Sequence, residues 1–95
     1  NMTAEEVIIE HIEKGKRRGY DDNRTEDGIE YLYRYSINKR GKEYVALFRK
    51  VEYEHIDNFE DYQTEIVEIF NNISDAIQFI KDKGGNLSMF KGFKG

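Results

Sequence analysis

Cysteine is absent from this sequence of 95 residues, and several kinds of chemistry are absent with it. Without thiols the chain cannot form disulfides, carry a thiolate nucleophile or build a zinc site with cysteine ligands. The two histidines, His11 and His55, do not form the helical pair, four residues apart, that zinc enzymes use. His11 falls on the apolar stripe of an expected helix and His55 in an acidic loop, so we expect no bound metal and no cofactor.

Long hydrophobic runs are missing as well. No apolar stretch approaches the roughly 18 residues that a membrane-spanning helix needs. The N-terminal region lacks a basic segment followed by an apolar one, so we expect no secretory signal. Together with the lack of cysteine, these features favour a cytoplasmic protein, and the excess of isoleucine over alanine is typical of an AT-rich bacterial coding sequence.

The sequence also lacks the motifs that carry catalysis. It has neither the phosphate-binding G-x-x-x-x-G-K-[ST] loop nor a G-x-G-x-x-G turn. The serines have no histidine placed near them in the expected fold, and no carboxylate lies in an apolar stretch of the kind that favours a general acid. We therefore expect that the protein is not an enzyme.

The composition that remains is that of a small folded protein. Hydrophobic residues make up 38% of the chain, and seven tyrosines and six phenylalanines argue against disorder. A chain of this length can bury one modest core without staples. We expect one domain over residues 1–85, followed by a tail or short edge strand over 86–95.

A β-hairpin over residues 29–53 is the strongest structural signal. Tyrosine and isoleucine alternate with polar residues over 29–37, which predicts a strand with its odd-numbered side chains in the core. A three-residue loop over 39–41 would place Gly41 where a left-handed conformation is needed. That register sets Tyr35 opposite Val45 and leaves the even-numbered residues of both strands on the outer face; a four-residue loop mixes apolar and charged residues on both faces.

The remaining segments flank this hairpin. Residues 3–14 are expected to form a helix, with Thr3 and Glu6 as its capping box. Residues 15–28 and 54–62 are expected to form loops, the second with one helical turn. Strand periodicity returns over 63–70, and a final helix is expected from a cap at Ser74 to Gly84.

The predicted fold is therefore α+β, in the order α-β-β-β-α, as a three-stranded antiparallel meander with both helices on one face. Double-stranded-RNA-binding domains share this order of elements, and they need lysines at the start of the last helix to hold phosphates. The corresponding residues here, 74–77, carry no positive charge. Membership of that class is not supported.

The charge is distributed unevenly along the chain. The net charge is −4 and the isoelectric point about 5.2, yet no lysine or arginine occurs between Lys50 and Lys81. An acidic edge of this kind would suit a basic partner, as in an immunity or inhibitor protein, because complementary charge selects partners. The predicted partner-binding residues, on the outer face of the hairpin and on the acidic edge, are Leu32, Arg34, Tyr44, Phe48, Glu52, Glu54, Asp57, Glu60 and Asp61.

Two other interpretations stay open. The outer face of the hairpin would also suit a homodimer. Basic residues cluster in two expected loops, and as an alternative they would hold nucleic acid, although the net negative charge speaks against it. The residues predicted for that role are Lys16, Arg17, Arg18, Lys39, Arg40 and Lys42.

Overall fold

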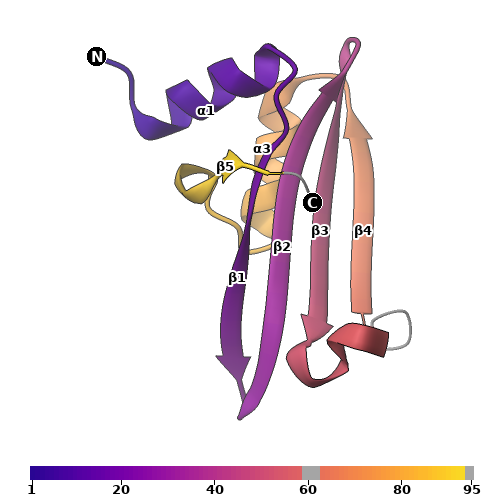
Figure 1. Ribbon diagram of the computed structural model, residues 1–95. Coiled ribbons are helices and arrows are strands. Elements are labelled where there is room, and N and C mark those ends of the chain that lie inside the picture. Colours follow the sequence, from indigo (N-terminus) through magenta and orange to yellow (C-terminus); the bar gives the residue numbers. More distant parts are fainter. Residues whose placement is uncertain (59–62, 94–95) are drawn as a thin grey trace.

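Two α-helices cover one face of a five-stranded antiparallel sheet (Figure 1). The structure is a computed structural model that describes residues 1–58 and 63–93. The strands lie in the order β4-β3-β2-β1-β5. In chain order the elements are α1 (Ala4–Glu13), β1 (Arg18–Glu26), β2 (Ile29–Arg40), β3 (Glu43–Glu52), the 3₁₀-helix η1 (Tyr53–Asn58), β4 (Gln63–Phe70), α3 (Ile73–Asp82), the 3₁₀-helix η2 (Leu87–Met89) and β5 (Lys91–Gly92).

The α+β class is confirmed, as are the meander of β2, β3 and β4, the helices on one face and the short C-terminal edge strand. The predicted capping box of α1 is also present. The Thr3 hydroxyl accepts from the Glu6 amide at 3.1 Å, and the Thr3 amide donates to the Glu6 carboxylate at 2.9 Å. Among the described residues, no helix is long and apolar enough to cross a membrane.

The expected loop over 15–28 is wrong, because most of it is strand β1. Its pairing with β2 ends in the two-residue turn Asp27–Gly28, where both residues have positive φ (51° and 80°). Asp-Gly is a favoured pair for this type I′ turn, whose twist matches that of the flanking strands. The strand was missed because its helix-side residues after Tyr20 are Asp22, Arg24 and Glu26, which give no apolar alternation.

The predicted register of the β2–β3 hairpin is wrong by three residues, because the turn is shorter and lies later in the chain than expected. Arg40 pairs with Glu43, so the turn is the two-residue Gly41–Lys42, with Gly41 at φ 60° as expected for its left-handed role. Tyr35 consequently pairs with Phe48 rather than Val45. The odd-numbered residues of β2 therefore share a face with the even-numbered residues of β3.

The cap of α3 lies two residues earlier than predicted. The Asn72 side chain, not Ser74, accepts the Asp75 amide at 2.9 Å. The helix therefore begins at Ile73, and this residue joins Ile77 in packing against the core.

The core lies between the helices and the part of the sheet nearer the Gly41–Lys42 turn (Figure 1). Its fully buried side chains include Ile12 of α1, Ile80 of α3, and Tyr35 and Ile37 of β2. On the open face, β1 approaches β2 so closely that a Cβ at Gly19 would lie 2.2 Å from the Tyr35 carbonyl oxygen. Only glycine fits there.

Candidate partner-binding surface

The basic and acidic segments lie at opposite ends of the sheet. The pairing of Arg18 with Ile37 places the basic residues 16–18 beside the end of β2, next to the Gly41–Lys42 turn. The other end of β2 carries the Asp27–Gly28 turn, with Glu52 and η1 beside it. The molecule measures 40 Å along its longest axis, so the two groups of charge are well separated relative to the screening length of about 8 Å in physiological salt.

Three of the predicted acidic residues, Glu52, Glu54 and Asp57, lie at the acidic end. Glu52 and Glu54 line a hollow of about 330 Å³, together with Glu30 from β2. The His55 imidazole lies 3.4 Å from the Glu52 carboxylate. Two further predicted residues, Glu60 and Asp61, lie outside the described residues.

Strand β4 forms a free edge of the sheet and runs from the acidic end, where Gln63 pairs with Val51, to the basic end, where Phe70 pairs with Tyr44. It pairs with β3 only, so the outer row of its backbone N–H and C=O groups has no strand partner within the described chain. Val67 and Ile69 point to the face that the helices leave open and are 53% and 59% exposed. Their neighbours on β3 are Leu47 and Val45, so an aliphatic patch adjoins this edge.

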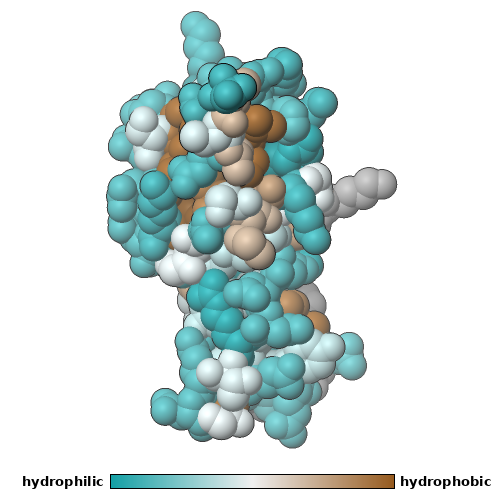
Figure 2. Space-filling view, turned by 90° about the vertical axis from the view of Figure 1, so that its left-hand side faces the viewer, coloured by the Kyte–Doolittle hydropathy of each residue, from teal (hydrophilic) through white to brown (hydrophobic). Residues whose placement is uncertain are grey.

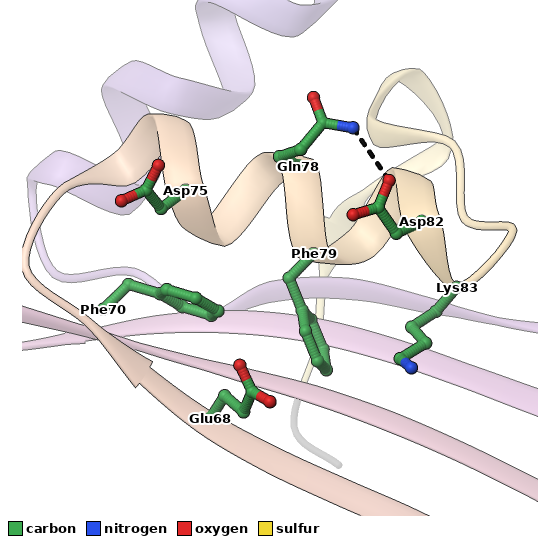
Figure 3. A pocket seen from close by; sticks show the side chains of 7 residues that line it. All are labelled: Glu68, Phe70, Asp75, Gln78, Phe79, Asp82 and Lys83. Atoms are coloured by element: carbon green, nitrogen blue, oxygen red, sulfur yellow. Dashed lines mark hydrogen bonds between the residues drawn. The ribbon is translucent and has the colours of Figure 1, made fainter.

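A pocket of about 370 Å³ opens between β4 and α3 on the helix side (Figure 3). Its floor is made by the rings of Phe70 and Phe79, whose centroids are 5.7 Å apart. Figure 3 shows the Glu68 carboxylate rising from the strand beside these rings. The remaining lining residues, all from α3 or its cap, are Asp75, Gln78, Asp82 and Lys83.

Hydrogen bonds hold the helical side of this pocket in place. The Gln78 amide donates to the Asp82 carboxylate at 2.9 Å, and Asn72 donates to the Asp75 carboxylate at 3.0 Å. The Lys83 ammonium lies 5.8 Å from the Phe79 ring centroid, near the outer limit for a cation–π contact. The pocket thus combines three carboxylates and one ammonium group with ring faces, and this excess of negative charge suits a guanidinium or ammonium group.

Sequence reasoning missed this pocket, although it carries two readable signals. The gap without lysine or arginine runs on from β3 through β4 to Lys81. Within α3, the polar residues Asp75, Gln78 and Asp82 recur at the three- and four-residue spacing that places side chains on one helix face.

The four residues predicted for the outer face of the hairpin do not lie on one face of the sheet. Leu32 and Arg34 do lie on the open face, but Tyr44 and Phe48 are buried in the core beneath the helices, at 7% and 8% exposure. The physical reason is the two-residue turn, which moves every β3 side chain to the opposite face from the predicted register. Arg34 is held by Asp21, with Nε donating at 2.7 Å, and lies 5.1 Å from the Phe93 ring.

The predicted basic residues all lie at one end of the sheet, but Arg18 differs from the others in its surroundings. Lys16, Arg17, Arg40 and Lys42 are exposed, and among the described residues none of them has an ion-pair partner. The Lys39 ammonium lies 5.7 Å from the Tyr44 ring. Arg18 is different, because it is half-buried against His11.

Nothing in the described part of the chain groups three or more carboxylate or imidazole side chains where they could hold a metal ion. Comparison of the chain with protein-family models, with curated proteins and with solved structures gives no match.

Proposed function

We propose that this protein is a small protein-binding module that takes a basic, extended segment of its partner along the β4 edge. The observation that carries the proposal is the origin of this surface: the free edge strand and five of the seven residues that line the pocket come from the stretch between Lys50 and Lys81, which has no lysine or arginine. An edge strand offers backbone hydrogen bonds to an added strand, and pockets beside it supply side-chain specificity.

The two faces of the β4 edge would contact an added basic segment in different ways. An added strand would contact the exposed side chains of Val67 and Ile69 on the open face. On the helix side, a lysine or arginine would meet Glu68 and the Phe79 ring, where a cation gains from both the carboxylate and the ring face. An acidic surface of this kind suits an inhibitor or immunity role against a basic, nucleic-acid-binding protein.

Pairing of β4 with a second copy of itself is a weaker alternative. Antiparallel self-pairing would bring the glutamates of two β4 strands together, and no lysine or arginine on this strand would offset their repulsion. A foreign basic segment meets no such penalty.

Affinity capture from cell extract tests the proposal, with Glu68→Lys compared with Glu43→Lys. Both residues are exposed strand glutamates, but Glu43, at the start of β3, lies on the open face of the sheet, whereas Glu68 lies on the helix side and lines the pocket. We expect a basic protein to be retained by the wild type and by Glu43→Lys, and to bind Glu68→Lys about tenfold more weakly. Equal retention by both variants would show that β4 is not the docking edge.

The convergence of the basic residues favours a second candidate, binding of single-stranded nucleic acid at the opposite end. Lys16 and Arg17 beside the Gly41–Lys42 turn would contact phosphates. Such binding weakens steeply as salt is raised. We expect Arg17→Glu with Arg40→Glu to abolish binding of a short labelled oligonucleotide; unchanged anisotropy would exclude this candidate.

A further inference from the structure

Arg18 differs from the other half-buried arginines of the described chain, because no carboxylate of the described residues pairs with it. A guanidinium removed from water normally gains a carboxylate partner, since desolvation of an unpaired charge is costly. The others each hold one at 2.7–2.9 Å: Arg24 with Asp22, Arg34 with Asp21, and Arg49 with Glu65.

Arg18 is held instead by two neutral acceptors. Its Nε and Nη2 lie 3.3 and 3.2 Å from Nδ1 of His11, and its Nη1 donates to the Arg17 carbonyl at 3.3 Å. Nδ1 can accept only if the imidazole is neutral and carries its proton on Nε2. A carboxylate brings a negative charge and can accept two parallel guanidinium N–H bonds, neither of which a neutral imidazole offers, so a carboxylate would displace His11 from this position.

The Arg18 side chain faces a groove of about 380 Å³ between α1 and the C-terminal segment. Figure 2, which views this side of the molecule, shows hydrophobic residues gathered in its upper half and hydrophilic residues in its lower half. Val7 is 38% exposed beside the groove, and a Cβ at Gly92 would lie only 3.4 Å from Arg18 Nη1. The groove is lined by Ala4, Val7, Ile8, His11, Arg18, Ser88, Phe90, Lys91 and Gly92.

This lining has two cationic residues and no carboxylate, in a protein of net charge −4. We propose that the groove binds a medium-chain alkyl carboxylate, with its head on Arg18 in place of His11 and its chain along Ala4, Val7 and Ile8. The length follows from α1, because Ala4 to His11 spans about 10 Å at 1.5 Å per residue, the extended length of about eight carbons. Beyond Ala4 the adjoining hollow is lined by Glu5 and Glu6 as well as by Ile9, so two carboxylates border the far end of the apolar path.

Nuclear magnetic resonance titration with sodium octanoate, kept below its micelle concentration, tests this site. We expect saturable shifts of the Arg18 Nε–H and of groove amides, with a dissociation constant of about 1 mM or tighter. Sodium acetate supplies the head alone and 1-octanol the tail alone, and each should bind at least about tenfold more weakly.

Matched variants separate the site from general charge attraction. Arg18→Gln should weaken octanoate binding about tenfold, whereas Arg17→Gln, its exposed neighbour, should change it less than about twofold. Val7→Asp places a charge in the tail path from an exposed position and should weaken binding without Arg18 being touched, even if Arg18→Gln perturbs the fold. Equal effects of Arg17→Gln and Arg18→Gln, absence of saturable shifts, or tighter binding of a peptide that ends in two leucines and a free carboxylate would overturn the proposal.

Discussion

The helix-covered and uncovered halves of the same sheet face are stabilised in different ways. Beneath α1 and α3 the face is closed by apolar side chains, and Ile12, Ile37 and Ile80 have no exposed surface at all. The hairpin of β1 and β2 extends beyond both helices (Figure 1). There the same face carries the half-buried side chains of Arg24 and Lys50.

In the uncovered half, tyrosine rings lie between cations and carboxylates. Arg24 lies 4.2 Å from the centroid of the Tyr33 ring, and the Lys50 ammonium lies 4.3 Å from that of Tyr31. The Tyr33 hydroxyl and the Lys50 ammonium both donate to Glu26, at 2.7 and 2.8 Å. The hydrogen bond from Lys50 lowers the pKa of Glu26, and in return Glu26 raises the pKa of Lys50.

The comparison shows that a sheet face can be ordered without a helix over it. The tyrosine rings and the aliphatic stems of Arg24 and Lys50 exclude water from one side. The charged ends of these two side chains stay solvated on the other side. Such an arrangement contributes less free energy than a dry core and is sensitive to salt and pH, because its charges remain near solvent.

The largest expected effect is in the covered half. Ile80→Ala removes a fully buried side chain of α3 and should lower the free energy of unfolding by about 2 to 5 kcal/mol, because a cavity remains in a packed core. Urea unfolding measures it. Val67→Ala, at an exposed aliphatic position, is the control and should cost less than about 0.5 kcal/mol. Similar losses for both would contradict the described core.

The second-largest loss of stability is expected at the boundary between the covered and uncovered halves of the sheet face. The Tyr35 hydroxyl donates to the Lys83 carbonyl at 2.7 Å, so Tyr35→Phe should cost about 1 to 2 kcal/mol by leaving that acceptor unpaired. Burial raises the pKa of Tyr35 to about 12, so the folded state resists its ionisation. Wild-type stability should therefore fall as pH rises from about 10 towards 12. The variant should lose this part of the alkaline dependence; an identical pH profile would contradict the assignment.

A smaller effect is expected in the uncovered half. Arg24→Met removes the contact with the Tyr33 ring, the ion pair with Asp22 and the hydrogen bond to the Gly84 carbonyl. We expect a loss of about 1 kcal/mol, because each partner stays near solvent. The loss should shrink at high salt, whereas that of Ile80→Ala should not. Equal salt responses would remove the distinction between the halves.

The smallest effect is expected in the acid unfolding of the protein. The pKa of Glu26 is lowered below its ordinary value, first by Lys50 and then by Tyr33, so the ionised carboxylate favours folding. That contribution is present above about pH 4.5 and is lost as pH falls through the lowered folded-state pKa. Glu26→Gln should make acid unfolding less steep, measured by circular dichroism. A steeper acid transition in the variant would reverse the sign of this coupling.

The sequence predicted the features that follow from periodicity and capping. The helix at Thr3, the hairpin strands and the third strand all carry local signals that the tertiary structure does not override. Strand β1 gave no such signal because its helix-side residues are held by ion pairs rather than by apolar burial. The Asp27–Gly28 pair was the signal that would have revealed it.

The binding surface was harder to predict than the fold. The position and length of the turn between β2 and β3 decided whether Tyr44 and Phe48 lay inside or outside, and neither of the two registers considered from the sequence is the observed one. The pocket between β4 and α3 and the groove at Arg18 each join segments far apart in the chain. Only the packing of those segments places their side chains together.

The strand order has a consequence for how the chain folds. From β1 to β4, each strand pairs with the next one in the sequence, and two of the three connections are two-residue turns. Contacts that are local in sequence form with little loss of loop-closure entropy, which favours rapid folding. Strand β5 alone pairs with a distant strand, β1. The meander can therefore assemble while the chain is still being synthesised, and the C-terminal segment completes the sheet last.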